Sequence, residues 1–315
     1  MNITFIGSGR YSDVFRIQDG RHTVIMKLSY YRDNTMAEFA KELRAGHADT
    51  AKHVKNRDSI MVSNAFSSMT NALVNGYKSP HFVYIYCSSD CQNMPQKLAP
   101  LIPSRMKTST STQLKYNNIC FMEQFSSDMT KWLRGRSKTL TDTNVCQAIF
   151  GVLYTLALLQ HKYPGFRHND LSTNNVLVKR TTKPQTIGYA INGSKFLVTT
   201  PTIVALSDYD FTHVPNHKSL QNERVVSGKY KVTQTPNPTY DTHFFLKTVL
   251  RNMQGKTKQL PKTISFLKSL PFKSDDRLDL QRVPGMEPHV LIKHAYFKPL
   301  QVRQFPQSVD VYSAS

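Results

Sequence analysis

The residues best placed to do chemistry in this chain lie around Asp170. The stretch has the form His-x-Asp-Leu-x-x-x-Asn, from His168 to Asn175, and it continues into the apolar run Val176 to Val178. A carboxylate at Asp170 could accept the proton of an attacking hydroxyl, and the amide of Asn175 could return to the same site to ligate Mg²⁺. Because this spacing also occurs by chance, its meaning depends on the groups around it.

Two groups that could bind phosphate lie near the start of the chain. Gly7-x-Gly9-x-x-Ser12-x-Val14 lies between two expected strands. The backbone of such a loop can close over nucleotide phosphates, with Val14 covering the adenine. Lys27 follows on an apolar strand, where its amine could hold the α- and β-phosphates. A lone Gly-x-Gly is typical of any tight turn, but the order of loop, hairpin and lysine favours phosphate binding.

Such a lysine needs an acidic partner to hold it in place. Glu42 and Glu38 lie one turn apart on a helix expected over Thr35 to Ala48. We prefer Glu42, because its separation from Lys27 better allows a loop and two helical turns.

A second pair of acids follows an apolar strand, in Leu206-Ser207-Asp208-Tyr209-Asp210-Phe211. An aspartate at the end of that strand could chelate the Mg²⁺ between the β- and γ-phosphates. Asp208 is preferred over Asp210, because Tyr209 then supplies an aromatic ring behind the metal site. The alternative is a surface turn that happens to carry two aspartates.

The elements that must position these residues follow from periodicity and turn signals. Strands are expected at Thr4 to Ile6, Val14 to Gln18, Thr23 to Leu28 and Ile119 to Glu123, with Asp19-Gly20 as a hairpin turn and a polar loop over 99–118. Apolar spacing predicts a buried helix over Asp142 to Lys162, capped by Thr141 or Asp142. Short strands at Val176 to Lys179 and Ile203 to Leu206 should flank a polar insertion over 180–200, and later helices are expected near 241–253, 259–269 and 287–294.

Composition limits the class of protein. The chain has 315 residues with 41 Lys and Arg against 21 Asp and Glu, a net charge of +20. This charge favours polyanionic partners, which could be nucleic acid, acidic protein segments or anionic lipid, although it is also compatible with a merely basic protein. No signal peptide is recognised, the apolar stretch Ala148 to Leu159 is too short to span a bilayer, and the four cysteines are expected to be reduced thiols. We therefore expect an intracellular protein.

Taken in order, these motifs resemble those of eukaryotic-type protein kinases. The resemblance is closest to haspin-like atypical kinases and the kinases of large DNA viruses, through Asp-Tyr in place of Asp-Phe-Gly and the insertion that ends at Tyr189-Ala190-Ile191-Asn192-Gly193. It implies an α+β, bilobal fold with an N-lobe over 1–123, a hinge over 124–128 and a C-lobe over 129–315. It also implies ATP and Mg²⁺ as cofactors and protein Ser/Thr hydroxyls as acceptors.

The resemblance assigns roles to individual residues. Asp170 would be the catalytic base, with Lys27 and Glu42 as the ion pair, and Asn175 and Asp208 would bind metal. His168 would be a scaffold residue, Asp241 would brace the catalytic loop, and Met122 would be the gatekeeper. The implied nucleotide-binding residues are Ile6, Gly7, Gly9, Val14, Lys27, Glu123, Phe125 and Asp128.

Several positions depart from the usual kinase pattern. Asn169 replaces the arginine that pairs with a phosphorylated activation loop, so we expect a loop that needs no such switch. Ser172 replaces a lysine that contacts the γ-phosphate, which removes a positive charge. No Ala-Pro-Glu motif follows Asp208. Two alternatives therefore stay open: a small-molecule kinase of the aminoglycoside or choline type, and a non-catalytic kinase-fold scaffold that binds acidic partners or nucleic acid.

Overall fold

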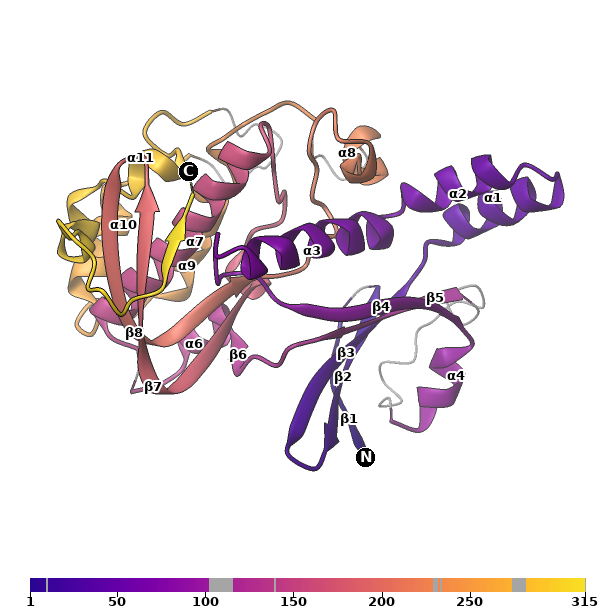
Figure 1. Ribbon diagram of the computed structural model, residues 1–315, viewed down its shortest axis with the longest axis horizontal. Coiled ribbons are helices and arrows are strands. Elements are labelled where there is room, and N and C mark those ends of the chain that lie inside the picture. Colours follow the sequence, from indigo (N-terminus) through magenta and orange to yellow (C-terminus); the bar gives the residue numbers. More distant parts are fainter. Residues whose placement is uncertain are drawn as a thin grey trace.

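The computed structural model describes residues 1–9, 11–101, 116–138, 140–228, 232, 234–273 and 282–314. They form a β-rich N-terminal lobe and a larger lobe that is mainly helical (Figure 1), as an α+β, bilobal kinase-like fold requires. Most of the loop expected over 99–118 lies outside the described residues. The proposed boundaries at 123 and 128 stay a prediction.

The N-terminal lobe is an antiparallel sheet of five strands in the order β1-β2-β3-β5-β4. Its strands are β1 (Asn2–Ser8), β2 (Ser12–Asp19), β3 (His22–Tyr30), β4 (Ile85–Gln92) and β5 (Tyr116–Met122). The expected turn at Asp19-Gly20 joins β2 to β3, where Gly20 has the positive φ of +56° that such a turn requires. In register, Lys27 lies between Val14 and Cys120, in the middle of the sheet. Short helices α4 (Met94–Leu98) and η1 (Ala99–Leu101) follow β4.

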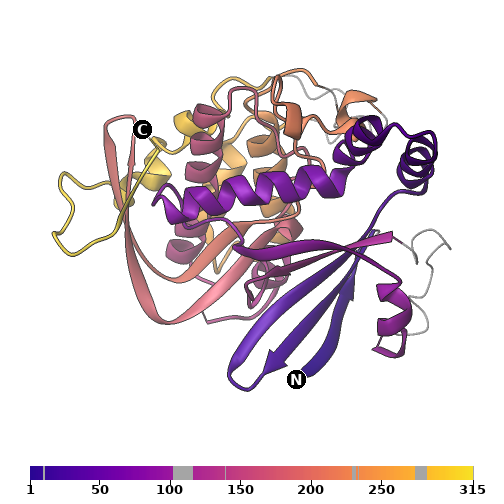
Figure 2. The same cartoon turned by 45° about the vertical axis from the view of Figure 1, so that its right-hand side comes forward.

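Between β3 and β4 the chain forms helices α1 (Asp33–Arg44), α2 (Ala48–Asn56) and α3 (Ser59–Asn75). The helix expected over Thr35 to Ala48 is therefore present as α1, but α1 and α2 form an antiparallel pair that projects from the body of the molecule. The helix that crosses the C-terminal helices is α3, as both ribbon views show (Figures 1 and 2). Its Val62, Phe66 and Leu73 belong to the large hydrophobic core.

Helix α7 (Asp142–Lys162) forms the centre of that core, with the bounds that periodicity predicts. The Thr141 side chain caps it by accepting a hydrogen bond from the Asn144 N–H. It is also long and apolar enough to cross a membrane, but 83% of its most apolar window is buried inside the protein, as in the core helix of a globular domain. Around it lie α6 (Met129–Arg134), α9 (Tyr240–Asn252), α10 (Pro261–Ser269), α11 (Pro288–Leu291) and η5 (Ala295–Leu300).

The insertion expected over 180–200 is a long β-hairpin, which corrects the prediction of two short strands. β7 (Val176–Ile191) and β8 (Ser194–Leu206) pair along most of their length, β6 (Ser127–Asp128) joins β7, and β9 (Val311–Ser313) pairs in parallel with the far part of β7. The base of the hairpin carries residues that the sequence singles out: the short turn η3 (Thr173–Asn175) leads into β7, and β8 leads into Asp208. Beyond it lie η4 (Lys218–Leu220) and α8 (Glu223–Val226).

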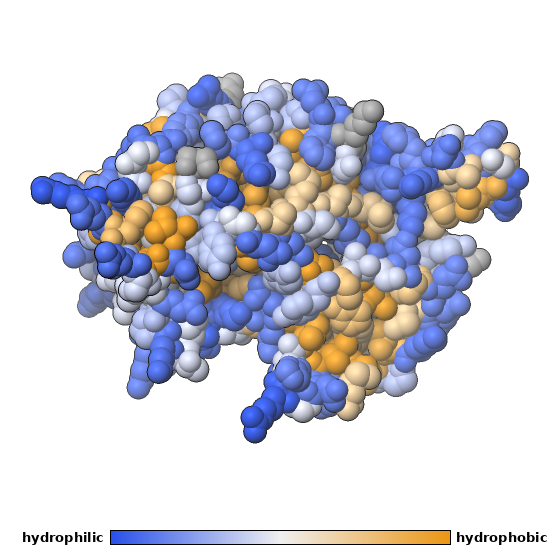
Figure 3. All heavy atoms as spheres, viewed as in Figure 1, coloured by the Kyte–Doolittle hydropathy of each residue, from blue (hydrophilic) through white to orange (hydrophobic). Residues whose placement is uncertain are grey.

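Polar and charged residues cover most of the face seen in Figure 3. Apolar residues gather there over the N-terminal sheet and on the projecting α1–α2 pair. Leu43 on α1 is 47% exposed, so the tip of this pair is partly apolar.

Candidate active site

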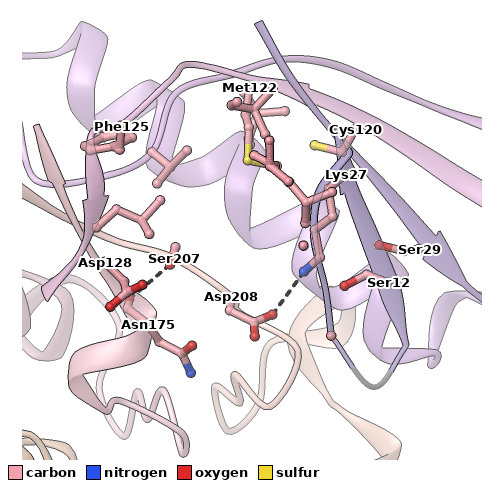
Figure 4. Close-up of a pocket in the computed structure, with 18 of the residues that line it drawn as sticks. Ser12, Lys27, Ser29, Cys120, Met122, Phe125, Asp128, Asn175, Ser207 and Asp208 are labelled. Carbon is pink, nitrogen blue, oxygen red and sulfur yellow. Dashed lines mark hydrogen bonds and ion pairs between the residues drawn. The ribbon is translucent and has the colours of Figure 1, made fainter. Parts of the chain in front are cut away.

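A cleft of about 640 Å³ lies between the two lobes. Ten of the residues that the sequence singles out line it: Ile6, Gly7, Gly9, Val14, Lys27, Glu123, Phe125, Asp128, Asn175 and Asp208. Met122 lines it as well. Figure 4 shows that Lys27 enters the cleft from the sheet, while Asn175 and Asp208 lie on the opposite side. The fold thus brings together groups that are far apart in the sequence.

Asp170 and Asn175, the two key residues of the candidate catalytic loop, are in direct contact. The Asn175 Nδ2 donates hydrogen bonds to the Asp170 backbone oxygen at 2.8 Å and to its Oδ2 at 3.1 Å. Because the amide nitrogen faces Asp170, the amide oxygen of Asn175 is turned away from that carboxylate and is the atom that could ligate a cation. The Ser207 N–H and hydroxyl both donate to the Asn175 backbone oxygen, which fixes this loop to the end of β8.

Asp241 holds the start of the same loop. This carboxylate is 1% exposed and accepts hydrogen bonds from the backbone N–H groups of His168 (2.7 Å) and Asn169 (2.9 Å). Burial raises its pKa. Asn169 has a φ of +66°, a left-handed conformation that asparagine tolerates better than most residues. His168 is fully buried and its Nε2 donates to the Ser207 oxygen at 3.0 Å, which fits the scaffold role.

Lys27 forms ion pairs with both acids that follow β8. Its Nζ lies 3.0 Å from the Asp208 Oδ1 and 3.8 Å from the Asp210 Oδ1. Burial alone would lower the pKa of Lys27, but the charges of Asp208 and Asp210 outweigh it and raise that pKa. The Lys27 charge in turn lowers the pKa of Asp208, whereas burial raises that of Asp210.

The predicted pair of Lys27 with Glu42 is wrong in this structure. Glu42 lies on the projecting α1 and its Oε2 contacts the His47 Nδ1 at 3.1 Å, while Glu38 is exposed. The helix that lines the cleft is α3, through Ile60, Ser63, Asn64 and Ser67. The sequence of α3 contains no aspartate or glutamate. The helix that carries Glu42 is therefore not the helix that lines the cleft.

Two residues expected at the nucleotide base and ribose have structural contacts as well. The Glu123 carboxylate accepts from the Tyr84 N–H at 3.0 Å and from the Lys179 Nζ at 2.9 Å. Asp128 caps α6 by accepting from the Lys131 N–H at 2.8 Å. Both residues line the cleft, and their nucleotide contacts stay a prediction.

Arg224 is a component of the site that sequence reasoning did not find. It is 2% exposed, and its guanidinium lies 4.8 Å from the centre of the Tyr11 ring and 5.1 Å from that of Phe211. It therefore joins the glycine loop to the segment that follows Asp208. On the same short helix, Glu223 forms an ion pair with Arg57 at the end of α2. A basic residue in a polar stretch carries no signal from which this position could have been predicted.

The donor set suits Mg²⁺ bound together with a phosphate ligand. Among the described residues, no three His, Cys, Asp or Glu side chains gather into a metal cage. Magnesium in phosphoryl-transfer sites uses one or two carboxylates together with substrate phosphates and water, so a dedicated cage is not needed. The Asp208 carboxylate and the Asn175 amide oxygen are groups that could serve as protein ligands in such a site.

Comparisons with known proteins point to the same class. The profile of the poxvirus serine/threonine protein kinase family matches residues 141–270, which contain the catalytic loop and Asp208. The matched segment is similar to this viral kinase family over about two fifths of the chain. Together with the α+β, bilobal architecture, this similarity supports a viral-type, kinase-like protein.

Two proteins of Acanthamoeba polyphaga mimivirus, each named "putative serine/threonine-protein kinase", are also similar. One is 28% identical over 132 residues, covering 39% of this chain and 28% of the relative. The other is 22% identical over 143 residues, covering 34% of this chain and 36% of the relative. The chain thus spans about a third of the length of these curated relatives. The closer resemblance to haspin stays a prediction.

Proposed function

We propose that this protein transfers the γ-phosphate of ATP to Ser/Thr hydroxyls of protein substrates, with Mg²⁺ as the required metal. The observation that carries the proposal is the Asp170–Asn175 pair, held by Asp241 next to a cleft that Lys27 and Asp208 enter from opposite lobes. The volume of that cleft lies within the range of small-ligand sites.

The chemistry of each group follows from its surroundings. Asp170, oriented by the Asn175 amide, would accept the proton of the attacking hydroxyl. Lys27 would bind phosphate oxygens, since its raised pKa keeps the amine protonated. Mg²⁺, held by Asn175 and Asp208, would neutralise charge on the phosphates when bound. The glycine loop, joined to the rest of the site through Arg224, would exclude water.

The +20 charge of the chain supports a proposal about acceptors. We expect acidic protein segments, or proteins carried on nucleic acid, to be better substrates than Lys/Arg-rich peptides, because a positive field attracts polyanions.

The test is the transfer of labelled γ-phosphate from Mg-ATP to a panel of acidic proteins, basic proteins, aminoglycosides and choline. Asp170→Asn and Asp208→Asn should each lower protein labelling by about 10²- to 10⁴-fold. Asp19→Asn is the matched control, since that side chain is 79% exposed, does not line the cleft, and lies five register positions along the β2–β3 ladder from the Val14–Lys27 pair. Label on small molecules alone would favour a small-molecule kinase. Nucleotide binding without any transfer would favour a scaffold.

A further inference from the structure

Lys27 is held without help from a helix. Its strand places the amine in the cleft, and a buried ammonium group needs a carboxylate nearby to offset its loss of hydration. The α3 side chains that line the cleft are apolar or neutral, and its span Ser59–Asn75 contains no aspartate or glutamate. The acid at its N-cap, Asp58, is fully buried and pairs with Arg32 at 3.0 Å. Among the described residues, the carboxylates that pair with Lys27 are those of Asp208 and Asp210.

These two carboxylates differ in how they are placed. The Asp208 side chain is 42% exposed and lines the cleft. The backbone of Asp208 has a φ of +63° at the turn that follows β8. The Asp210 side chain is 21% exposed, and its backbone oxygen accepts a hydrogen bond from the buried Asn222 Nδ2 at 2.7 Å. Asp210 is therefore the more enclosed of the two and is fixed by a second segment of the chain.

Tyr209 fixes the direction of both acids. Its ring is 3% exposed and packs edge-on against Phe66 of α3, with ring centres 4.7 Å apart. Its hydroxyl donates to the Leu206 oxygen at 2.8 Å. With Tyr209 anchored behind the site, Asp208 and Asp210 on either side of it both line the cleft.

One carboxylate cannot serve a cation and Lys27 equally well. In the proposed function Asp208 binds Mg²⁺, and its pairing with Lys27 would then weaken, because the metal competes for the same oxygens. Asp210 would remain as the acid beside the amine.

We propose that Asp210 is the positioning residue for Lys27 in the metal-loaded site, in the place where a carboxylate on the neighbouring helix was expected. This inference rests on the proposed function, because it takes Asp208 as the metal ligand. Asp210 acts through Lys27 and need not touch the reacting atoms.

The experiment is a double-mutant cycle on ADP affinity, measured by calorimetry with Mg²⁺ and with EDTA. It compares Asp210→Asn and Asp208→Asn, each in the parent chain and in a Lys27→Met background. For each background, the effect of Asp210→Asn is the Kd of the variant divided by the Kd of its parent. With Mg²⁺, this ratio should be about tenfold higher in the chain that retains Lys27 than in the Lys27→Met chain. Asp208→Asn is the matched control: with Mg²⁺ its ratio should be the same in both backgrounds, and with EDTA it too should depend on Lys27. Asp210→Glu should retain most of the coupling.

Two results would overturn the inference. The first is an Asp210→Asn ratio that does not depend on Lys27. The second is a raised Mg²⁺ requirement for Asp210→Asn in both backgrounds, which would make Asp210 a metal ligand. Because ADP affinity needs no phosphate transfer, a chain that binds Mg-ADP without transferring phosphate would refute the proposed activity while the cycle still decides the role of Asp210. A chain that binds no nucleotide would refute both.

Discussion

Acidification should destabilise this protein through one buried histidine. His81 is 4% exposed and belongs to the segment of chain that joins α3 to β4. Its ring stacks on that of Tyr189. Its Nδ1 lies 2.7 Å from the Val204 oxygen, so Nδ1 must carry the proton, and Nε2 then accepts from the Tyr189 hydroxyl at 2.8 Å. Burial lowers the pKa of His81 from 6.5 to about 4.

The sign and size of the effect follow from that difference. A histidine whose pKa is lowered by folding stabilises the protein above pH 6.5, and this contribution is lost as the pH falls toward 4. Between pH 7.5 and pH 5 the loss is about 2 kcal/mol, and below pH 4 it reaches about 3 kcal/mol. The His81→Gln variant should be less stable at pH 7.5, because it loses the contacts of the buried ring. Because it lacks the titrating group, it should not show the loss of about 2 kcal/mol between pH 7.5 and pH 5.

The assay is urea unfolding of the wild type and His81→Gln at both pH values. Other groups titrate in both chains, so the difference in free energy of unfolding isolates His81, and it should shrink by about 2 kcal/mol at pH 5. If the difference is the same at pH 7.5 and pH 5, burial does not lower the pKa of His81. Should His81→Gln fail to fold, an NMR titration of the His81 ring in the wild type gives its pKa directly, and a value near 6.5 would refute the reasoning equally well.

Two further predictions concern the packing that supports the site. Gly151→Ala should lower the free energy of unfolding by about 1–3 kcal/mol, because the new Cβ would lie 2.7 Å from the His81 Cε1, whereas helix propensity alone would raise it by about 1 kcal/mol; a stabilised variant in a thermal melt would contradict this. Asp241→Ala leaves the His168 and Asn169 N–H groups unpaired and should cost about 2–6 kcal/mol, together with most of any phosphate transfer. Asp19→Ala is its exposed control, and equal melting temperatures for the two variants would show that Asp241 does not brace the loop.

Local patterns predicted much of this fold because they are set by local physics. The bounds of α7 follow from apolar spacing and a threonine cap, and the hairpin at Gly20 follows from a positive φ. The long hairpin was missed because the middle of β7 is exposed on both faces and so shows no alternation. The partner strand β8 did carry a signal: Phe196, Val198, Thr200 and Thr202 are buried in alternation.

The site was predicted where its residues lie on motifs and missed where they depend on the path of the chain. Gly7, Lys27, Asn175 and Asp208 meet in one cleft because strands and turns of fixed geometry carry them there. The partner of Lys27 could not be predicted in the same way. The separation of Lys27 and Glu42 along the sequence fits the spacing expected between a kinase lysine and its helix glutamate. In the structure, Glu42 lies on the projecting α1–α2 pair and contacts His47. No local pattern reveals that an insertion has separated a lysine from its expected helix.

The location of Asp210, on the segment after β8 and not on a helix, also bears on regulation. A lysine held by a helix can be switched when that helix rotates, since the rotation withdraws the carboxylate. Here the span of α3 contains no acid, and its N-cap Asp58 pairs with Arg32. Phe66 of α3 stacks on Phe166, with ring centres 5.3 Å apart, and makes an edge contact with Tyr209. If Asp210 holds Lys27, the acid that pairs with the lysine and the proposed metal ligand Asp208 are carried by one short segment after β8, so these two acids order or disorder together. Such a site would respond to the binding of metal and nucleotide and not to movement of a helix. The sequence leads to a matching expectation, because Asn169 stands where the resemblance expects an arginine that would pair with a phosphorylated loop.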